Sequence, residues 1–158
     1  MVKAVCDSNF DEIERLVKKE GFDLNGTTVD KEDKFSAQAL AAYLDNLEVL
    51  HLLDLLGADI SSSKGKFQFT PLQAAESRWN VRVVDYLMER GVNPFVKDSY
   101  GFTAKEKAKL REHKTIASML NAYEQKYRQA SQDGTTLAKS PFINESAEKI
   151  LVSKDNLL

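Results

Sequence analysis

The chain has 158 residues, of which 42% are hydrophobic and 29% are charged, and its formal net charge is −2. This composition predicts one soluble domain with a tail. It argues against a nucleic-acid-binding protein, because such proteins usually carry a basic face or have an isoelectric point above about 9. The most apolar stretch, residues 47–58, is interrupted by Glu48, His51 and Asp54, so no run is long enough for a membrane span. We therefore expect neither a nucleic-acid partner nor a membrane partner.

The first segment, residues 1–21, predicts a partial structural unit. Its apolar and terminal positions are Val5, Ile13, Val17 and Gly21. The single cysteine, Cys6, cannot form an internal disulfide, and we expect it to be a packed thiol. Residues 1–6 become polar too early for a secretory signal peptide, so we expect a cytoplasmic or nuclear protein.

Three short motifs then follow at nearly one period. They are Phe35-Ser36-Ala37, Phe69-Thr70-Pro71 and Phe102-Thr103-Ala104. Their Ser/Thr positions lie 34 and 33 residues apart, a spacing that predicts a stack of identical supersecondary units. Each Ser or Thr is expected to cap a short inner helix, and Pro71 suits the first helical position because its missing N–H would have no partner there.

An outer helix is predicted after each inner helix. In the central unit, Val83, Val84 and Leu87 supply its buried face and Gly91 its C-terminal turn. The same template finds Val49, Leu50, Leu53 and Gly57 one unit earlier, and Ile116, Ala117 and Leu120 one unit later. We predict that Leu53, Leu87 and Leu120 are almost fully buried at equivalent places, and that both glycines adopt a left-handed conformation.

The central hexapeptide of residues 70–75, TPLQAA, resembles the T-P-L-H-x-A signature of ankyrin repeats, with Gln73 in place of His. Residues 1–125 as a whole resemble an ankyrin-repeat domain of about three and a half units. The resemblance implies an all-α solenoid of helix-turn-helix units with finger loops. It also implies a monomer that binds another protein.

Departures from the family pattern mark unusual positions. Ankyrin repeats usually have Gly between the two helices of a unit, whereas this chain has Asp45, Trp79 and Glu112. Trp and Glu tolerate positive φ poorly, so the sequence leaves the turn geometry open at those two positions. In the last unit, Lys105 and Lys107 replace apolar and small residues, which predicts a polar unit that closes the stack.

Residues 126–158 are predicted to be a linker and a C-terminal tail. The segment 125–139 is rich in Gln, Ser, Thr and Lys and lacks apolar periodicity. A short amphipathic helix is expected next, with Ile143, Ala147, Ile150 and Leu151 on one side. It would be unstable alone, so it is either disordered or docked on the last unit, the concave groove or a partner.

The resemblance also implies where a partner would bind. Ankyrin domains usually hold partners with the finger tips and the exposed ends of the inner helices, and these positions give the candidate residues. They are Asp33, Tyr43, Phe67, Phe69, Ser77, Arg78, Trp79, Tyr100, Phe102, Leu110 and Arg111. We expect Phe67, Arg78 and Tyr100 to be exposed on one concave face. A structural alternative is that Phe35, Phe69 and Phe102 stack as a ladder between adjacent fingers.

The function predicted from these features is a protein-protein interaction module, an adaptor or a scaffold. The alternative is a stoichiometric inhibitor or assembly factor that covers a partner enzyme or complex with the same face. We expect no enzymatic activity, cofactor or metal. The two histidines, His51 and His113, have no neighbouring Cys or carboxylate pattern at zinc spacing.

Overall fold

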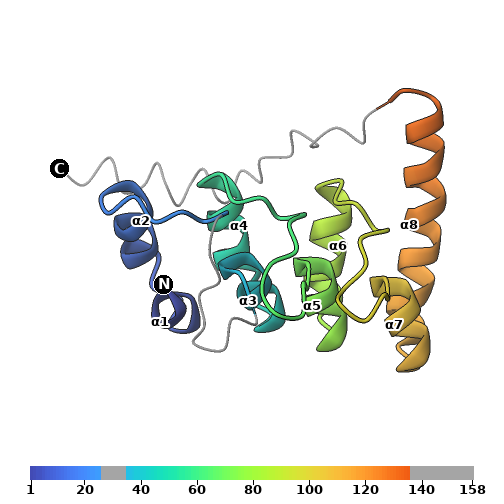
Figure 1. Cartoon of the computed structure of the whole chain (residues 1–158), viewed down its shortest axis with the longest axis horizontal. Helices are drawn as coiled ribbons and strands as arrows, with labels where there is room; N and C mark the ends of the chain where they lie inside the picture. Colours follow the sequence, from blue (N-terminus) through green and yellow to red (C-terminus); the bar gives the residue numbers. More distant parts are fainter. Residues whose placement is uncertain (26–34, 136–158) are drawn as a thin grey trace.

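The computed structural model describes residues 1–25 and 35–135, and within these ranges the chain is all-helical. The helices are α1 Val2–Cys6, α2 Phe10–Lys18, α3 Ala37–Tyr43, α4 Leu47–Leu55, α5 Pro71–Ser77, α6 Val81–Glu89, α7 Ala104–Leu110 and α8 Lys114–Gln132. They form pairs that follow one another along the long axis of the molecule, from α1 and α2 at one end to α7 and α8 at the other (Figure 1). The predicted solenoid of helix-turn-helix units is confirmed.

The inner helices α3, α5 and α7 begin as the sequence predicts. The hydroxyl oxygens of Ser36, Thr70 and Thr103 accept hydrogen bonds from backbone N–H groups three residues on, at 3.2, 3.2 and 3.3 Å. These bonds satisfy amides that have no partner inside the helix. Pro71 occupies the first turn of α5, where a missing N–H has no cost.

The core runs along the stack between the inner and outer helices. Leu53, Leu87 and Leu120 are each 0% exposed, which confirms their equivalent places. Successive units are also tied by polar bonds. The Asn80 side chain donates to the carbonyl oxygens of Ala42 and Tyr43 at 2.7 and 3.1 Å, and so satisfies the C-terminal end of α3 from the next unit.

The turns between the two helices of a unit keep the family geometry despite their unfavourable residues. Asp45, Trp79 and Glu112 have φ of 57°, 59° and 58°, so the two turns that the sequence left open have the same left-handed conformation as the turn at Asp45. The turn is held by the residue that follows it. For example, the His113 amide donates to the Ala108 carbonyl at 2.8 Å. Gly57 and Gly91 also have positive φ, as predicted, at 91° and 75°.

Replacing Glu112 by glycine should raise the free energy of unfolding by about 1 kcal/mol, because a left-handed conformation costs a residue with a Cβ roughly 1–2 kcal/mol. No hydrogen bond or ion pair of the Glu112 side chain is recorded within the described residues, so little else is lost. Urea unfolding measures the change. Glu112→Ala is the control, since it removes the same side chain but keeps the strain. Equal stabilities for the two variants would contradict the prediction.

Helix α8 is longer than the sequence suggests. It crosses the predicted boundary at residue 125 and ends at Gln132, so the linker prediction is wrong for residues 125–132. Aromatic contacts support the extension, because the ring of Tyr127 lies 6.0 Å from those of Phe95 and Tyr123, and the Tyr123 hydroxyl donates to Val92 O at 2.7 Å. The predicted tail helix lies outside the described residues, as does Asp33.

The expectation of a packed thiol at Cys6 is wrong. Cys6 is exposed, because helix α1 has only five residues and turns Ala4 and Val5 into the core instead. None of the helices in residues 1–25 and 35–135 is both long and apolar enough to cross a membrane.

Candidate protein-binding surface

A row of aromatic side chains crosses three consecutive units. The centroid of the Phe35 ring lies 5.1 Å from that of Tyr43 and 6.0 Å from that of Phe69. The row continues through Phe67, whose ring stacks on Phe69 at 5.6 Å and on Tyr100 at 6.1 Å. Aromatic pairs at such distances are attractive beyond their apolar area. These five residues are called the aromatic row below.

The finger loops, which connect the outer helix of one unit to the inner helix of the next, hold the aromatic row in place through their backbones. A β-bridge between Lys64 and Phe69 closes the middle finger. The Ser99 amide donates to Phe67 O at 3.1 Å and joins this finger to the next. At the tip of that next finger, Asp98 Oδ1 accepts from the amides of Tyr100 and Phe102 at 2.9 and 3.1 Å. The rings are therefore presented on ordered loops.

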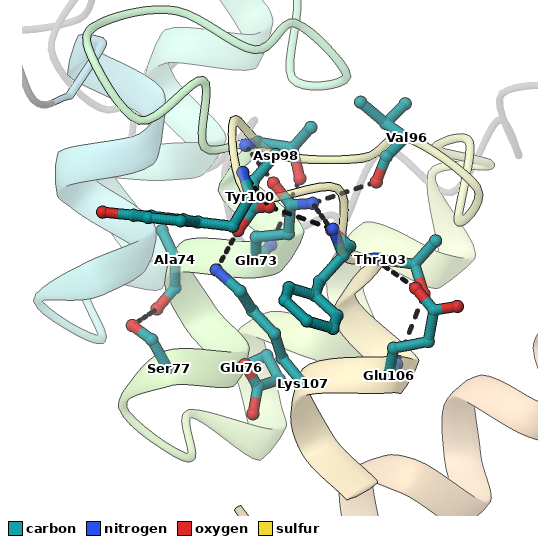
Figure 2. A network of polar contacts seen from close by, with 12 residues as sticks. Gln73, Ala74, Glu76, Ser77, Val96, Asp98, Tyr100, Thr103, Glu106 and Lys107 are labelled. Carbon is teal, nitrogen blue, oxygen red and sulfur yellow. Dashed lines mark hydrogen bonds and ion pairs between the residues drawn. The ribbon is translucent and has the colours of Figure 1, made fainter. Parts of the chain in front are cut away.

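A buried ion pair lies beneath the Tyr100 end of the aromatic row. Lys107, on the inner helix α7, is 8% exposed and pairs with Asp98, which is 6% exposed. Figure 2 shows Lys107 reaching toward Asp98 under the ring of Tyr100. The Lys107 amine also lies 4.3 Å from the Phe69 ring centroid and 5.8 Å from that of Tyr100. It therefore supports the row from below by cation–π attraction.

The charge of Asp98 is favoured by its surroundings. Burial acts to raise its pKa, but the ion pair with Lys107 and the hydrogen bonds from Phe102 and Tyr100 outweigh it, and the pKa lies below the usual range. Asp98 therefore stays ionised, which keeps the Lys107 ammonium compensated. Lys105, the other lysine of this polar last unit, likewise pairs with a buried carboxylate, that of Glu124.

Gln73 links the middle and last units where the family has His. Its amide nitrogen donates to Val96 O at 2.9 Å and to Phe102 O at 3.1 Å, and its oxygen accepts from the Thr70 amide at 3.0 Å (Figure 2). Gln73 thus closes the cap of its own helix and positions the finger of the following unit.

The C-terminal ends of the inner helices carry a second polar cluster. Glu76 is fully buried, and its two carboxylate oxygens contact Arg111 Nη1 at 2.5 Å and His113 Nδ1 at 2.9 Å. Burial raises the pKa of Glu76 even though Arg111 and His113 act in the opposite direction. The Trp79 ring stacks on His113, with centroids 5.8 Å apart and planes 5° apart.

Most of the exposed large apolar side chains lie on the fingers and at the C-terminal ends of the inner helices. Within the described residues, seven large hydrophobic side chains are exposed, and five of them belong to fingers, inner-helix ends or the turns that follow them. These five are Leu44, Trp79, Tyr100, Phe102 and Leu110. The remaining two, Phe10 and Leu55, lie on the outer helices α2 and α4.

The structure places the predicted site residues at different depths. Arg78 and Arg111 are exposed like the apolar residues just named, and Arg78 lies over the Tyr43 ring with its guanidinium carbon 5.1 Å from the centroid. Tyr43, Ser77, Phe67 and Phe69 are half-buried, so the expectation of an exposed Phe67 is wrong, because it is stacked between two rings. The alternative ladder exists in part: Phe35 contacts Phe69, whereas Phe102 has no ring partner among the described residues.

Sequence reasoning missed the polar residues that support this surface, namely Glu76, Asp98 and Lys107. A signal was present in the repeat register. Lys107 stands 33 residues after Ala74, and Glu76 stands 34 residues after Ala42. A charged residue in a packed helix, at a position where the preceding unit has alanine, requires a partner, because an unpaired buried charge is costly.

Within residues 1–25 and 35–135, no group of three or more His, Cys, Asp or Glu side chains is arranged to hold a metal ion. The described residues form stacked helix pairs with ordered finger loops. This architecture is typical of repeat proteins, which bind partners on an extended surface. Residues 67–99 match the family model described as the ankyrin repeat. This match covers the central unit, and the all-helical stack of the described residues is consistent with ankyrin helix-turn-helix repeats on either side of it. A search of curated proteins finds no match.

Proposed function

We propose that this protein is an adaptor or scaffold that recruits another protein through the aromatic row and the neighbouring ends of the inner helices. Ankyrin repeats are in general protein-protein interaction modules. The observation that carries the proposal for this chain is the gathering of Leu44, Trp79, Tyr100, Phe102 and Leu110 on fingers, inner-helix ends and turns. Exposed apolar clusters bordered by Arg are typical of sites where proteins bind.

The proposed mechanism is preorganised surface complementarity, without catalysis or a cofactor. The fingers are held by Gln73 and by Asp98, so little loop ordering remains to oppose binding. A monomer with a cytoplasmic or nuclear location stays a prediction from the sequence. An inhibitor or assembly factor would use the same surface, and an activity assay on the captured partner separates it from an adaptor.

Replacing Tyr100 and Leu110 together by alanine should weaken partner binding by about 1–2 kcal/mol for each side chain, because both would be desolvated at the centre of the interface. They are 63% and 68% exposed in the free protein, so the melting temperature should hardly change. The measurement is quantitative mass spectrometry of proteins captured by the full chain, with differential scanning fluorimetry of each variant.

Leu55→Ala is the matched control, because Leu55 is 48% exposed but lies on the outer helix α4. It should leave capture unchanged. Two outcomes would contradict the assignment of the partner-binding surface to the aromatic row and the inner-helix ends. Leu55→Ala could lose the same partners as the double variant, or the double variant could retain them all.

A further inference from the structure

Two arginines occupy the same structural position in adjacent units of the proposed binding surface. Arg78 is the C-cap residue of α5 and Arg111 is the C-cap residue of α7, and these two inner helices pack against each other. Neighbouring packed helices lie about 8–10 Å apart. Both side chains reach toward the preceding unit, Arg78 to the Tyr43 ring and Arg111 to the Glu76 carboxylate, so the helix spacing is also the expected separation of the two guanidinium groups.

Both guanidinium groups keep donors for a ligand. Arg78 is exposed, and its one recorded contact in the described part of the chain is with the ring of Tyr43. Arg111 uses Nη1 to bind Glu76 and has a side chain that is 39% exposed. A guanidinium has five N–H donors, so both can still bind a carboxylate with two parallel hydrogen bonds. The ring and the buried carboxylate also limit the freedom of these long side chains before any partner arrives.

The charges around the two arginines favour an anionic ligand. The buried carboxylates of Asp98 and Glu76 are paired with Lys107 and Arg111, whereas Arg78 forms no ion pair with the described residues and keeps an uncompensated positive charge. Lys66, whose amine lies 5.9 Å from the Phe67 ring centroid, adds a further cation beside the aromatic row. Exposed Glu112 directly follows Arg111 and offsets part of its charge. Arg78 should consequently be the stronger of the two binding positions.

The spacing selects the form of the ligand. A polyproline II segment rises about 3.1 Å per residue with three residues per turn, so side chains at i and i+3 lie on the same side about 9 Å apart. In a β-strand, side chains three apart point to opposite sides. We propose that this surface binds an extended acidic segment of a partner protein, in which two carboxylates three residues apart contact Arg78 and Arg111. The proposal rests on the function proposed above and names the chemistry of the partner.

The test is selection of random ten-residue peptides on the full chain. Peptides with Asp or Glu at i and i+3 should be enriched, and changing both to Gln or Asn in a selected peptide should weaken binding at least about tenfold, as expected for charge-assisted hydrogen bonds. Affinity should also fall as salt is added. No enrichment of this spacing, or equal binding of the amide peptide, would overturn the proposal.

Variants assign the site. Arg78→Gln should weaken the selected peptides about tenfold or more, whereas Arg82→Gln should not, because Arg82 is an exposed arginine on the outer helix α6. Arg111→Lys keeps a cation for Glu76 but removes the planar fork, and a smaller loss is expected. Equal losses for Arg78→Gln and Arg82→Gln would show non-specific attraction and overturn the assignment, as would equally tight binding of a single-stranded oligonucleotide with the same number of negative charges.

Partner capture separates this inference from the proposed function. If the Tyr100 and Leu110 double variant loses partners and Arg78→Gln keeps them, the surface is correct and the acidic segment is wrong. If both lose them, both proposals are supported. If the double variant keeps all partners, the proposed function itself fails.

Discussion

Truncation of Leu87 to alanine is expected to lower the free energy of unfolding by about 2–5 kcal/mol, the cost of removing a large aliphatic side chain from a packed core. Leu87 is 0% exposed in α6, the outer helix of the central unit, and belongs to the continuous core of the stack. A repeat unit cannot bury its apolar face alone, so a cavity there weakens the contacts with both neighbouring units. Equilibrium unfolding in urea, followed by circular dichroism, measures the loss.

The outer helix α4 supplies the control for this prediction. Leu55→Ala makes the same chemical change at a side chain that is 48% exposed, and surface substitutions usually change stability by about 0.5 kcal/mol or less. A small effect at Leu87, or a comparable loss at Leu55, would contradict the repeat register on which the assignment of inner and outer helices depends.

The fold was predictable because its signals are local. Ser36, Thr70 and Thr103 each cap a helix within three residues, and their spacing defines the unit. Where local preference and packing disagree, packing prevails. Trp79 keeps a φ of 59° because the amide of the following residue, Asn80, bonds to Ala75 O at 3.0 Å and the Asn80 side chain binds the preceding unit.

The end of the last unit was less predictable. Polar composition after Tyr123 suggested a linker, but Tyr127 packs on Phe95, a residue of the preceding loop. A contact between residues 32 positions apart leaves no periodic pattern in the sequence of α8. Arg128 adds to it, with its guanidinium carbon 4.8 Å from the Phe95 ring centroid.

The candidate surface was predictable in outline, because the register fixes which residues occupy the fingers and inner-helix ends. Its supporting chemistry was not. Glu76 meets Arg111 and His113 across 35 and 37 residues, and a sequence alone shows only that a charge stands where its counterpart one unit earlier is alanine. The depth of Phe67 likewise depends on two rings from its own and the next finger.

Replacement of Asp98 by asparagine is expected to destabilise the fold by about 3 kcal/mol, because it leaves the Lys107 ammonium buried without its counter-charge. Asparagine has nearly the same shape, and its side-chain oxygen can still accept from the amides of Tyr100 and Phe102. The variant thus isolates the charge. Thermal and urea unfolding of the variant and the natural protein measure the difference.

A second variant separates the charge from the packing. Adding Lys107→Met to Asp98→Asn removes both charges and keeps a long apolar side chain under Phe69 and Tyr100, so most of the lost stability should return. If the double variant were as unstable as Asp98→Asn alone, the effect would come from the finger backbone and not from the ion pair.

The Asp98–Lys107 ion pair also predicts how the free energy of unfolding changes at low pH. Because the folded state lowers the pKa of Asp98, this carboxylate contributes stability that is fully present above its ordinary pKa of about 4 and is lost as the pH falls through the lowered value. The unfolded chain binds the proton more readily in that window, so stability must fall as the pH decreases. Asp98→Asn lacks the titrating group and should show a smaller loss of unfolding free energy than the natural protein as the pH is lowered below about 4. Parallel acid profiles for the two proteins would mean that Asp98 has its ordinary pKa and that the pair with Lys107 does not hold its charge.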